Sequence, residues 1–234
     1  EDYKGAIADL TKAIELDPNN AIAYKNRGDA KYNLDNYKGA IADLTKAIEL
    51  DPNDADTYYL RGISKMEIGN YNDAIVDFTK VIKIDPNSSF AYYDRGNAKN
   101  SLEDYKGAIA DLTKAIELDP NDADTYYLRG ISKMEIGNYN DAIVDYTEAI
   151  ELDSNSSNTY TYRGITKYYQ QDYRGAVTDY TKAIAMDSNN GFAYNNRGIS
   201  NFFLSEMEEA CDDWFRATDL GIEAANEYIA EYCN

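Results

Sequence analysis

The sequence has no histidine and only two cysteines, Cys211 and Cys233, among its 234 residues. Histidine is the commonest side chain for acid–base chemistry near neutral pH and a principal zinc ligand, so most sites of either kind are excluded. A cysteine nucleophile would also lack the histidine that usually generates its thiolate. Because no phosphate-binding loop is present either, we expect a protein without catalytic activity, metal or cofactor.

Basic residues are scarce, with 23 Lys and Arg against 42 Asp and Glu, which gives a net charge of −19. This charge repels nucleic acid and anionic membrane surfaces, and it favours partners with basic segments. No apolar run approaches the length of a membrane span, and no signal peptide is present. We therefore expect no membrane insertion and a soluble chain. The cytoplasm is slightly favoured, or the periplasm or secretion if the cysteines pair.

The chain repeats itself every 34 residues. Residues 37–77 recur without change as residues 105–145, and residues 3–17 match residues 37–51. All four prolines share one register, which is completed by Ser154 and Ser188. Two positions later in each repeat stands Asn, Asp or Ser, residue types that cap helix N-termini. Such a period is typical of a repeat array.

Each repeat carries two amphipathic helical patterns, over about residues 21–34 and 37–50 in the first complete copy. The short link between them predicts an antiparallel hairpin. Glycine recurs in the middle of the first pattern, where it costs about 1 kcal/mol relative to alanine. A cost repeated at one register indicates close contact between helices. The positions are Gly28, Gly62, Gly96, Gly130, Gly164 and Gly198.

These positions resemble the tetratricopeptide repeat family, in a bacterial type of array. The family pattern of aromatic, glycine, alanine, aromatic, alanine and proline is matched here by Tyr58, Gly62, Ala74, Phe78, Val81 and Pro86, with Val81 where alanine is usual. The resemblance implies an all-α fold, an α-solenoid in which antiparallel helix pairs form a right-handed superhelix. We expect about fourteen helices, counting a C-terminal capping helix, and a concave groove lined by the first helix of each repeat.

A single solenoid is therefore expected over residues 1–234. Residues 1–20 supply the second helix of a truncated repeat, as expected for a piece of a longer array. The complete repeats occupy residues 21–54, 55–88, 89–122, 123–156, 157–190 and 191–222, and residues 223–234 form the capping helix.

Arginine and aspartate form two further rows at the 34-residue period. The arginines could grip an anionic ligand, or they could pair with the aspartates in a structural ladder between the helices of each hairpin. We favour the ladder, because an acidic row accompanies the basic one. Its members are Arg27, Arg61, Arg95, Arg129, Arg163 and Arg197, with Asp43, Asp77, Asp111, Asp145, Asp179 and Asp213.

The two cysteines lie at the start of the last repeat's second helix and at the end of the capping helix. Because these helices should run antiparallel, the two sulphurs could lie within bonding distance. Two buried thiols that pack as small apolar groups are the alternative.

The resemblance implies that ligands contact the solvent-facing side of the first helices. In the early repeats this side is acidic, as at Asp56 and Asp94, whereas after Asn155 it carries aromatic and amide side chains. Packing between repeats is the alternative role for these aromatic residues. The predicted groove residues are Tyr59, Tyr93, Tyr127, Leu128, Ile131, Met134, Tyr162, Ile165, Tyr168, Tyr169, Phe192, Asn195, Ile199 and Phe202.

The predicted function is a scaffold that binds a protein or peptide segment with basic and apolar or aromatic residues. A clamp for the acidic C-terminal tails of Hsp70 or Hsp90 is excluded, because family members of that kind use basic and amide residues where Leu60, Phe90 and Asp94 stand here. The alternative is a self-assembly module, in which the open helix face near residues 1–16 forms a homo-oligomer.

Overall fold

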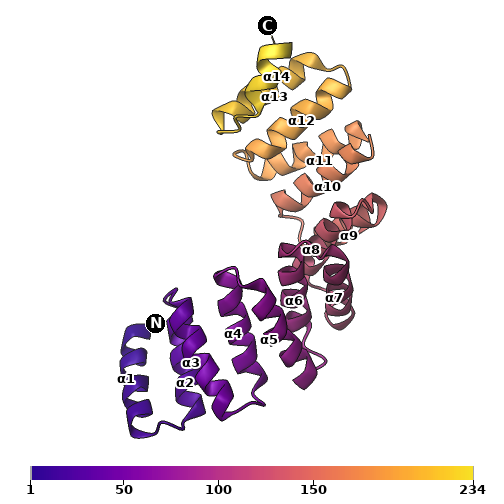
Figure 1. The fold of residues 1–234 in the computed structure, drawn as a ribbon. Coiled ribbons are helices and arrows are strands. Elements are labelled where there is room, and N and C mark those ends of the chain that lie inside the picture. Colours follow the sequence, from indigo (N-terminus) through magenta and orange to yellow (C-terminus); the bar gives the residue numbers. More distant parts are fainter. Residues whose placement is uncertain (1, 234) are drawn as a thin grey trace. The chain divides into compact units, whose positions relative to one another are not determined.

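The computed structural model describes residues 2–233, and this part of the chain contains fourteen helices and no strand. The all-α repeat fold expected from the sequence is thus confirmed. The chain divides into two compact units, Glu1–Pro120 and Asn121–Asn234. Within each unit, every helix packs against the next one along the chain (Figure 1).

The first unit contains helices α1 to α7. Helix α4 also contacts both α2 and α6, which places the first helix of each repeat on the inner side of this unit. The bounds are α1 Tyr3–Leu16, α2 Ala21–Tyr32, α3 Tyr37–Leu50, α4 Ala55–Glu67, α5 Tyr71–Ile84, α6 Ser89–Ser101 and α7 Tyr105–Leu118.

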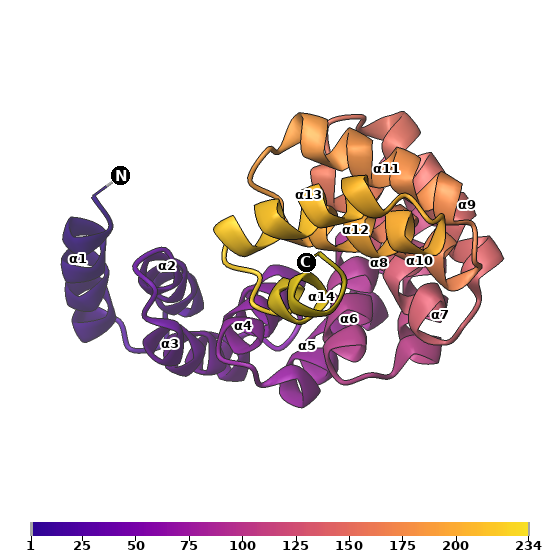
Figure 2. The same cartoon turned by 90° about the horizontal axis from the view of Figure 1, so that it is seen from above.

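The second unit contains helices α8 to α14, and here α10 contacts both α8 and α12. The last helix, α14, lies against α13 (Figure 2). It begins at Ala225, two residues later than the sequence predicts, after a turn in which Gly221 has φ of 88°. The bounds are α8 Ala123–Glu135, α9 Tyr139–Leu152, α10 Ser157–Tyr169, α11 Tyr173–Met186, α12 Gly191–Phe203, α13 Met207–Asp219 and α14 Ala225–Tyr232.

Polar caps begin most of the helices. The Asn20 side chain accepts a hydrogen bond from the backbone N–H of Ala23 at 3.0 Å and so starts α2. At the start of α3, Asn36 accepts from the N–H of Gly39 at 3.1 Å. A Cβ on Gly39 would lie 2.6 Å from the Asn36 side chain, so the cap requires glycine there. Such caps satisfy backbone donors that have no partner within the helix.

The core of each hairpin is built around a glycine and a large side chain. A Cβ on Gly62 would lie 2.6 Å from the ring of Phe78, and a Cβ on Gly198 would lie 2.7 Å from the indole of Trp214. Both large side chains are fully buried. Glycine therefore lets the two helices approach closely enough for the ring to fill the space between them.

Candidate functional site

The arginines that recur every 34 residues pair with aspartates inside every complete hairpin. In the first, Arg27 donates from Nε and Nη2 to the two carboxylate oxygens of Asp43 at 2.8 and 2.7 Å. The same bidentate geometry joins Arg61 to Asp77, Arg95 to Asp111, Arg129 to Asp145, Arg163 to Asp179 and Arg197 to Asp213.

The remaining arginine donors are also used. Arg61 Nη1 donates to Thr45 on the preceding hairpin at 3.1 Å, and its guanidinium lies 5.7 Å from the centre of the Tyr58 ring. Asp77 itself is only 1% exposed. This arginine is therefore committed to packing rather than to an anionic ligand, because its donors face protein partners.

A lysine completes the ion pairs in five of the hairpins, and the sequence interpretation missed it. Lys65 Nζ lies 2.7 Å from Asp77, one helical turn after Arg61. Its spacing of four residues from the arginine was the signal that could have found it. The other members are Lys31, Lys99, Lys133 and Lys167, at 2.6–2.7 Å from their aspartates.

In the first hairpin the two cations lower the pKa of the buried aspartate. Burial alone would raise the pKa of Asp43, but hydrogen bonds from Arg27 and Lys31 bring it below its ordinary value. In the last hairpin, where Asn201 replaces the lysine, burial raises the pKa of Asp213 and the hydrogen bond from Arg197 offsets only part of the rise. Two cationic hydrogen bonds thus outweigh burial at Asp43, whereas the single one at Asp213 does not outweigh burial and the nearby acids Asp212 and Glu209.

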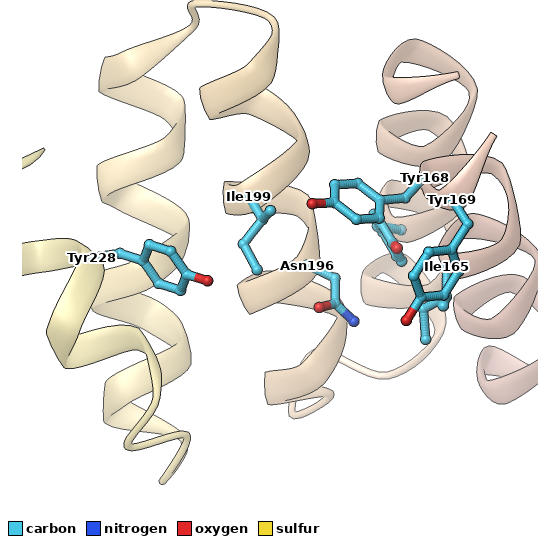
Figure 3. A pocket seen from close by; sticks show the side chains of 7 residues that line it. Ile165, Tyr168, Tyr169, Asn196, Ile199 and Tyr228 are labelled. Atoms are coloured by element: carbon cyan, nitrogen blue, oxygen red, sulfur yellow. The ribbon is translucent and has the colours of Figure 1, made fainter. Parts of the chain in front are cut away.

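An aromatic hollow of about 330 Å³ opens between α10, α12 and α14. Tyr168 and Tyr228 enter it from opposite sides and direct their hydroxyl groups inward, with Ile199 and Asn196 between them (Figure 3). We call this space the α10–α14 hollow. Its lining consists of Ile165, Tyr168, Tyr169, Tyr180, Asn196, Ile199 and Tyr228.

A second hollow of about 360 Å³ adjoins the first and shares Ile165 and Asn196 with it. Phe192 at its rim is 67% exposed. Asn190 shapes it, because its amide donates to Ser157 at 3.0 Å and thereby ties the start of α12 to α10. We call this space the α8–α12 hollow. Its lining consists of Tyr127, Asn158, Thr161, Tyr162, Ile165, Asn190, Phe192 and Asn196.

The structure brings seven of the predicted groove residues to these hollows. They are Tyr127, Tyr162, Ile165, Tyr168, Tyr169, Phe192 and Ile199. Tyr228 of α14 stacks on Trp214, with ring centres 4.9 Å apart, and also lines a hollow. Tyr180 of α11 fills the core of its hairpin and also lines the α10–α14 hollow.

Four other predicted groove residues are engaged in packing instead. The sequence places Leu128, Met134 and Asn195 in the groove, but each is at most 9% exposed. Phe202 lies 4.7 Å from Tyr232 and 6.2 Å from Trp214, between ring centres, so it belongs to the junction with α14. Each of them stands at the same position of its repeat as a residue that lines a hollow in another repeat: Tyr162 for Leu128, Tyr168 for Met134 and Phe202, and Tyr127 for Asn195. Helical spacing alone therefore could not separate the two groups, because the neighbouring helices decide which of them are covered.

The other predicted residues are half-buried on the first helices. Tyr59 of α4 packs edge-on against Phe90, with ring centres 4.8 Å apart. Burial raises the pKa of the neighbouring Asp94 to about 6, and a hydrogen bond from Tyr59 only partly offsets this rise. Tyr93 lies beside Asp94 on α6, and Ile131 of α8 packs against the core around Tyr146. The acidic half of the predicted groove thus contains a carboxyl group with a raised pKa, because burial disfavours its charged form.

Cys211 and Cys233 form a disulfide that joins α13 to the end of α14, with the two Cα atoms 5.7 Å apart. Of the two alternatives left open by the sequence, the structure contains the bonded one. Between residues 2 and 233, no helix combines the length and the apolar character needed to cross a membrane.

Models of one repeat family match most of the chain. A model described as TPR repeat matches residues 1–35, 28–69 and 96–133. Two models described as Tetratricopeptide repeat match residues 55–88 and 123–156, and residues 163–227. No curated protein matches the sequence.

Solved structures share this fold. MamA is 30% identical, with 69% of this chain and 94% of that chain covered and a TM-score of 0.67. YrrB, described as a TPR protein with an unusual peptide-binding site, is 27% identical, with 79% and 95% covered and a TM-score of 0.69. MamA from Desulfovibrio magneticus RS-1, from residue 41 to its end, is 25% identical, with 73% and 96% covered and a TM-score of 0.70. The repeated hairpins, the family matches and these structures show that the chain belongs to the tetratricopeptide repeat family.

Proposed function

We propose that this chain is a non-catalytic scaffold that binds an extended segment of a protein partner in the two hollows of its second unit. Tetratricopeptide repeats are a fold of protein–protein interaction. The adjoining α10–α14 and α8–α12 hollows carry the proposal, because together they offer about 330 and 360 Å³ of space lined by aromatic rings and amides. Concave apolar sites with a few polar groups are typical of ligand binding.

The lining supports an apolar or aromatic anchor on the partner. Tyr169 and Phe192 are 56% and 67% exposed, so a bound side chain could cover apolar surface that water now contacts. The Asn196 amide, shared by both hollows, offers a donor and an acceptor to a peptide backbone. The net charge of −19 favours basic residues elsewhere in the segment.

The repeats supply matched controls for a mutational test. Phe192→Ala and Asn196→Ala remove side chains of the hollows, whereas Phe90→Ala and Asn26→Ala remove the same residue types at the same helical positions in the first unit. We expect peptides selected from a displayed library on the intact chain to bind the first pair of variants at least about tenfold more weakly, a loss typical of central interface residues. Equal binding by all four variants would rule out the hollows.

A second candidate function is self-assembly through α1. Ala6, Leu10 and Ala13 on this helix are half-buried, whereas the matching Ala40 and Leu44 of α3 are fully buried. A second copy could cover this face. Light scattering would then show a dimer that Leu10→Glu converts to a monomer, and a monomer at every concentration would exclude the proposal.

We also propose that the protein resides in an oxidising compartment. The disulfide between Cys211 and Cys233 supports an oxidising compartment, because such bonds are rare where thiols are kept reduced. Labelling of the protein from its native cell with a thiol reagent, before and after reduction, tests this: label before reduction would place it in a reducing compartment.

A further inference from the structure

The last hairpin departs from the ion-pair pattern of the other five. Where a lysine one turn after the arginine contacts the buried aspartate in those hairpins, Asn201 stands here. Its shorter side chain donates to Asp213 at 3.3 Å, and among residues 2–233 no ammonium forms an ion pair with the carboxylate. The aspartate therefore has one cationic partner, Arg197, instead of two.

A recess of about 360 Å³ lies beside this asparagine, between α11, α12 and α13. Its charged lining consists of one arginine, Arg197, and four acids, Glu206, Glu209, Asp212 and Asp213. Glu206, Glu209 and Asp212 are exposed, and none of them forms an ion pair with another described residue. We call this space the Asn201 recess. Its charge is complementary to a cation.

A second, independent feature points to a missing hydrogen-bond donor. Asn201 is 4% exposed and lines the recess, yet its Oδ1 has no hydrogen-bond partner. A buried acceptor without a donor is destabilising, so an entering donor would relieve that cost. A cluster of acids alone would not make this argument, because solvated acidic faces are common.

We propose that the Asn201 recess binds the ammonium group of a lysine side chain supplied by a partner. The equivalent hairpin shows the geometry, because Lys65 Nζ there lies 2.7 Å from Asp77 Oδ2 and 3.3 Å from the carbonyl oxygen of Asp73. The matching groups in the last hairpin are Asp213 Oδ2 and the carbonyl oxygen of Glu209. A partner's lysine thus completes in trans the arrangement that five hairpins complete in cis.

The ionisation of Asp213 agrees with an incomplete site. Burial raises its pKa, the hydrogen bond from Arg197 opposes this, and the nearby Asp212 and Glu209 add to the rise. A second cation would favour the ionised form. A metal ion is a poorer occupant, because among residues 2–233 no group of three or more Cys, Asp or Glu side chains is arranged to hold one.

This site goes beyond the proposed function, because it shares no residue with the two aromatic hollows. A segment could occupy either one alone, and the failure of one proposal leaves the other standing.

The test uses Nα-acetyl-lysine N-methylamide as the probe and the side-chain Nε–H signals of the arginines as the NMR readout. We expect a saturable shift of the Arg197 signal, with Arg61 unchanged because Lys65 already fills its hairpin. The norleucine analogue of the probe should give no shift. Asn201→Lys should weaken probe binding at least about tenfold, because it fills the recess in cis.

This variant should fold, because five hairpins carry lysine at the same position. Glu209→Gln provides a second variant and should weaken binding severalfold while leaving Asn201 in place. The proposal is overturned if no saturable shift occurs, if Asn201→Lys binds the probe as well as the unaltered chain, or if magnesium at equal ionic strength produces the same shift.

Discussion

At the scale of single residues, the link between the two helices of each hairpin holds a left-handed residue. Gly69 and Gly137 occupy this position with φ of 73° and 77°, but Asp35, Glu103, Gln171 and Ser205 occupy it with φ of 57–64°. Residues with a Cβ pay a steric cost in this conformation that glycine does not. The four hairpins without glycine therefore carry local strain.

Glu103→Gly should stabilise the chain by about 0.5–1 kcal/mol, the strain relieved less the added freedom of glycine in the unfolded state. Urea denaturation measures the change. Glu103→Ala is the control, because it removes the same exposed side chain but keeps the Cβ. A glycine variant that is less stable than the alanine variant would show that backbone strain is absent, because only the added freedom of glycine in the unfolded state would then remain.

Asp94 gives a pH dependence of known sign. Its pKa rises from 3.8 to about 6 in the folded chain, so the folded state holds the proton more tightly than the unfolded state. Its contribution to stability is therefore lost as the pH rises from about 4 to about 6, by an amount on the order of 3 kcal/mol.

Asp94→Asn removes this titration. The variant should gain stability over the unaltered chain as the pH rises from 4 to 7, and the difference between the two free energies of unfolding isolates Asp94 from the other carboxyl groups. A difference that stays constant across this range would mean that the carboxyl group is well solvated.

At the scale of the helix pair, the buried ion pairs hold the hairpins and their neighbours in register. Arg61 links Asp77 of its own hairpin to Thr45 of the preceding one. Removal of one partner from a buried pair leaves an uncompensated charge, which costs far more than the loss of a surface pair.

Arg61→Met should therefore destabilise the chain by up to about 3 kcal/mol. The loss is limited because Lys65 still pairs with Asp77 in this variant. The control is Lys46→Met, which breaks the exposed pair with Glu49 and should change the stability little. Chemical denaturation of both variants provides the comparison. Similar losses in the two would contradict a structural role for the ladder.

Much at this scale is readable from the sequence, because each signal repeats. The glycine of the first helix and the arginine and aspartate of the ladder recur at fixed places, so hairpins and pairings could be predicted together. The role of Asn201 could not be predicted from a recurring signal, because Asn201 is the one residue in its row that is not a lysine. Leu128 and Asn195 were misplaced because burial depends on the neighbouring helices rather than on the residue type.

At the scale of the whole molecule, positions that are copied between repeats form the scaffold, whereas positions that vary between repeats include those that line the hollows. Residues 37–77 and 105–145 are identical, so they specify scaffold that both copies share. One register on the first helices varies freely: it holds Asn26, Leu60, Asp94, Leu128, Tyr162 and Asn196. Its last two members line the hollows, whereas Leu128 is buried. The sequence could mark this variation but not the depth of the hollows, which side chains from α14 help to form.

The central claim is that a partner segment occupies the two hollows of the second unit. Four isoleucines at one helical position report on it, since Ile165 and Ile199 line the hollows and Ile63 and Ile131 occupy the same place on α4 and α8. NMR of isoleucine methyl groups during titration with a library-selected peptide makes the comparison. We expect saturable shifts at Ile165 and Ile199 with little change at Ile63. Shifts centred on Ile63, or equal shifts at all four isoleucines, would exclude binding in the hollows.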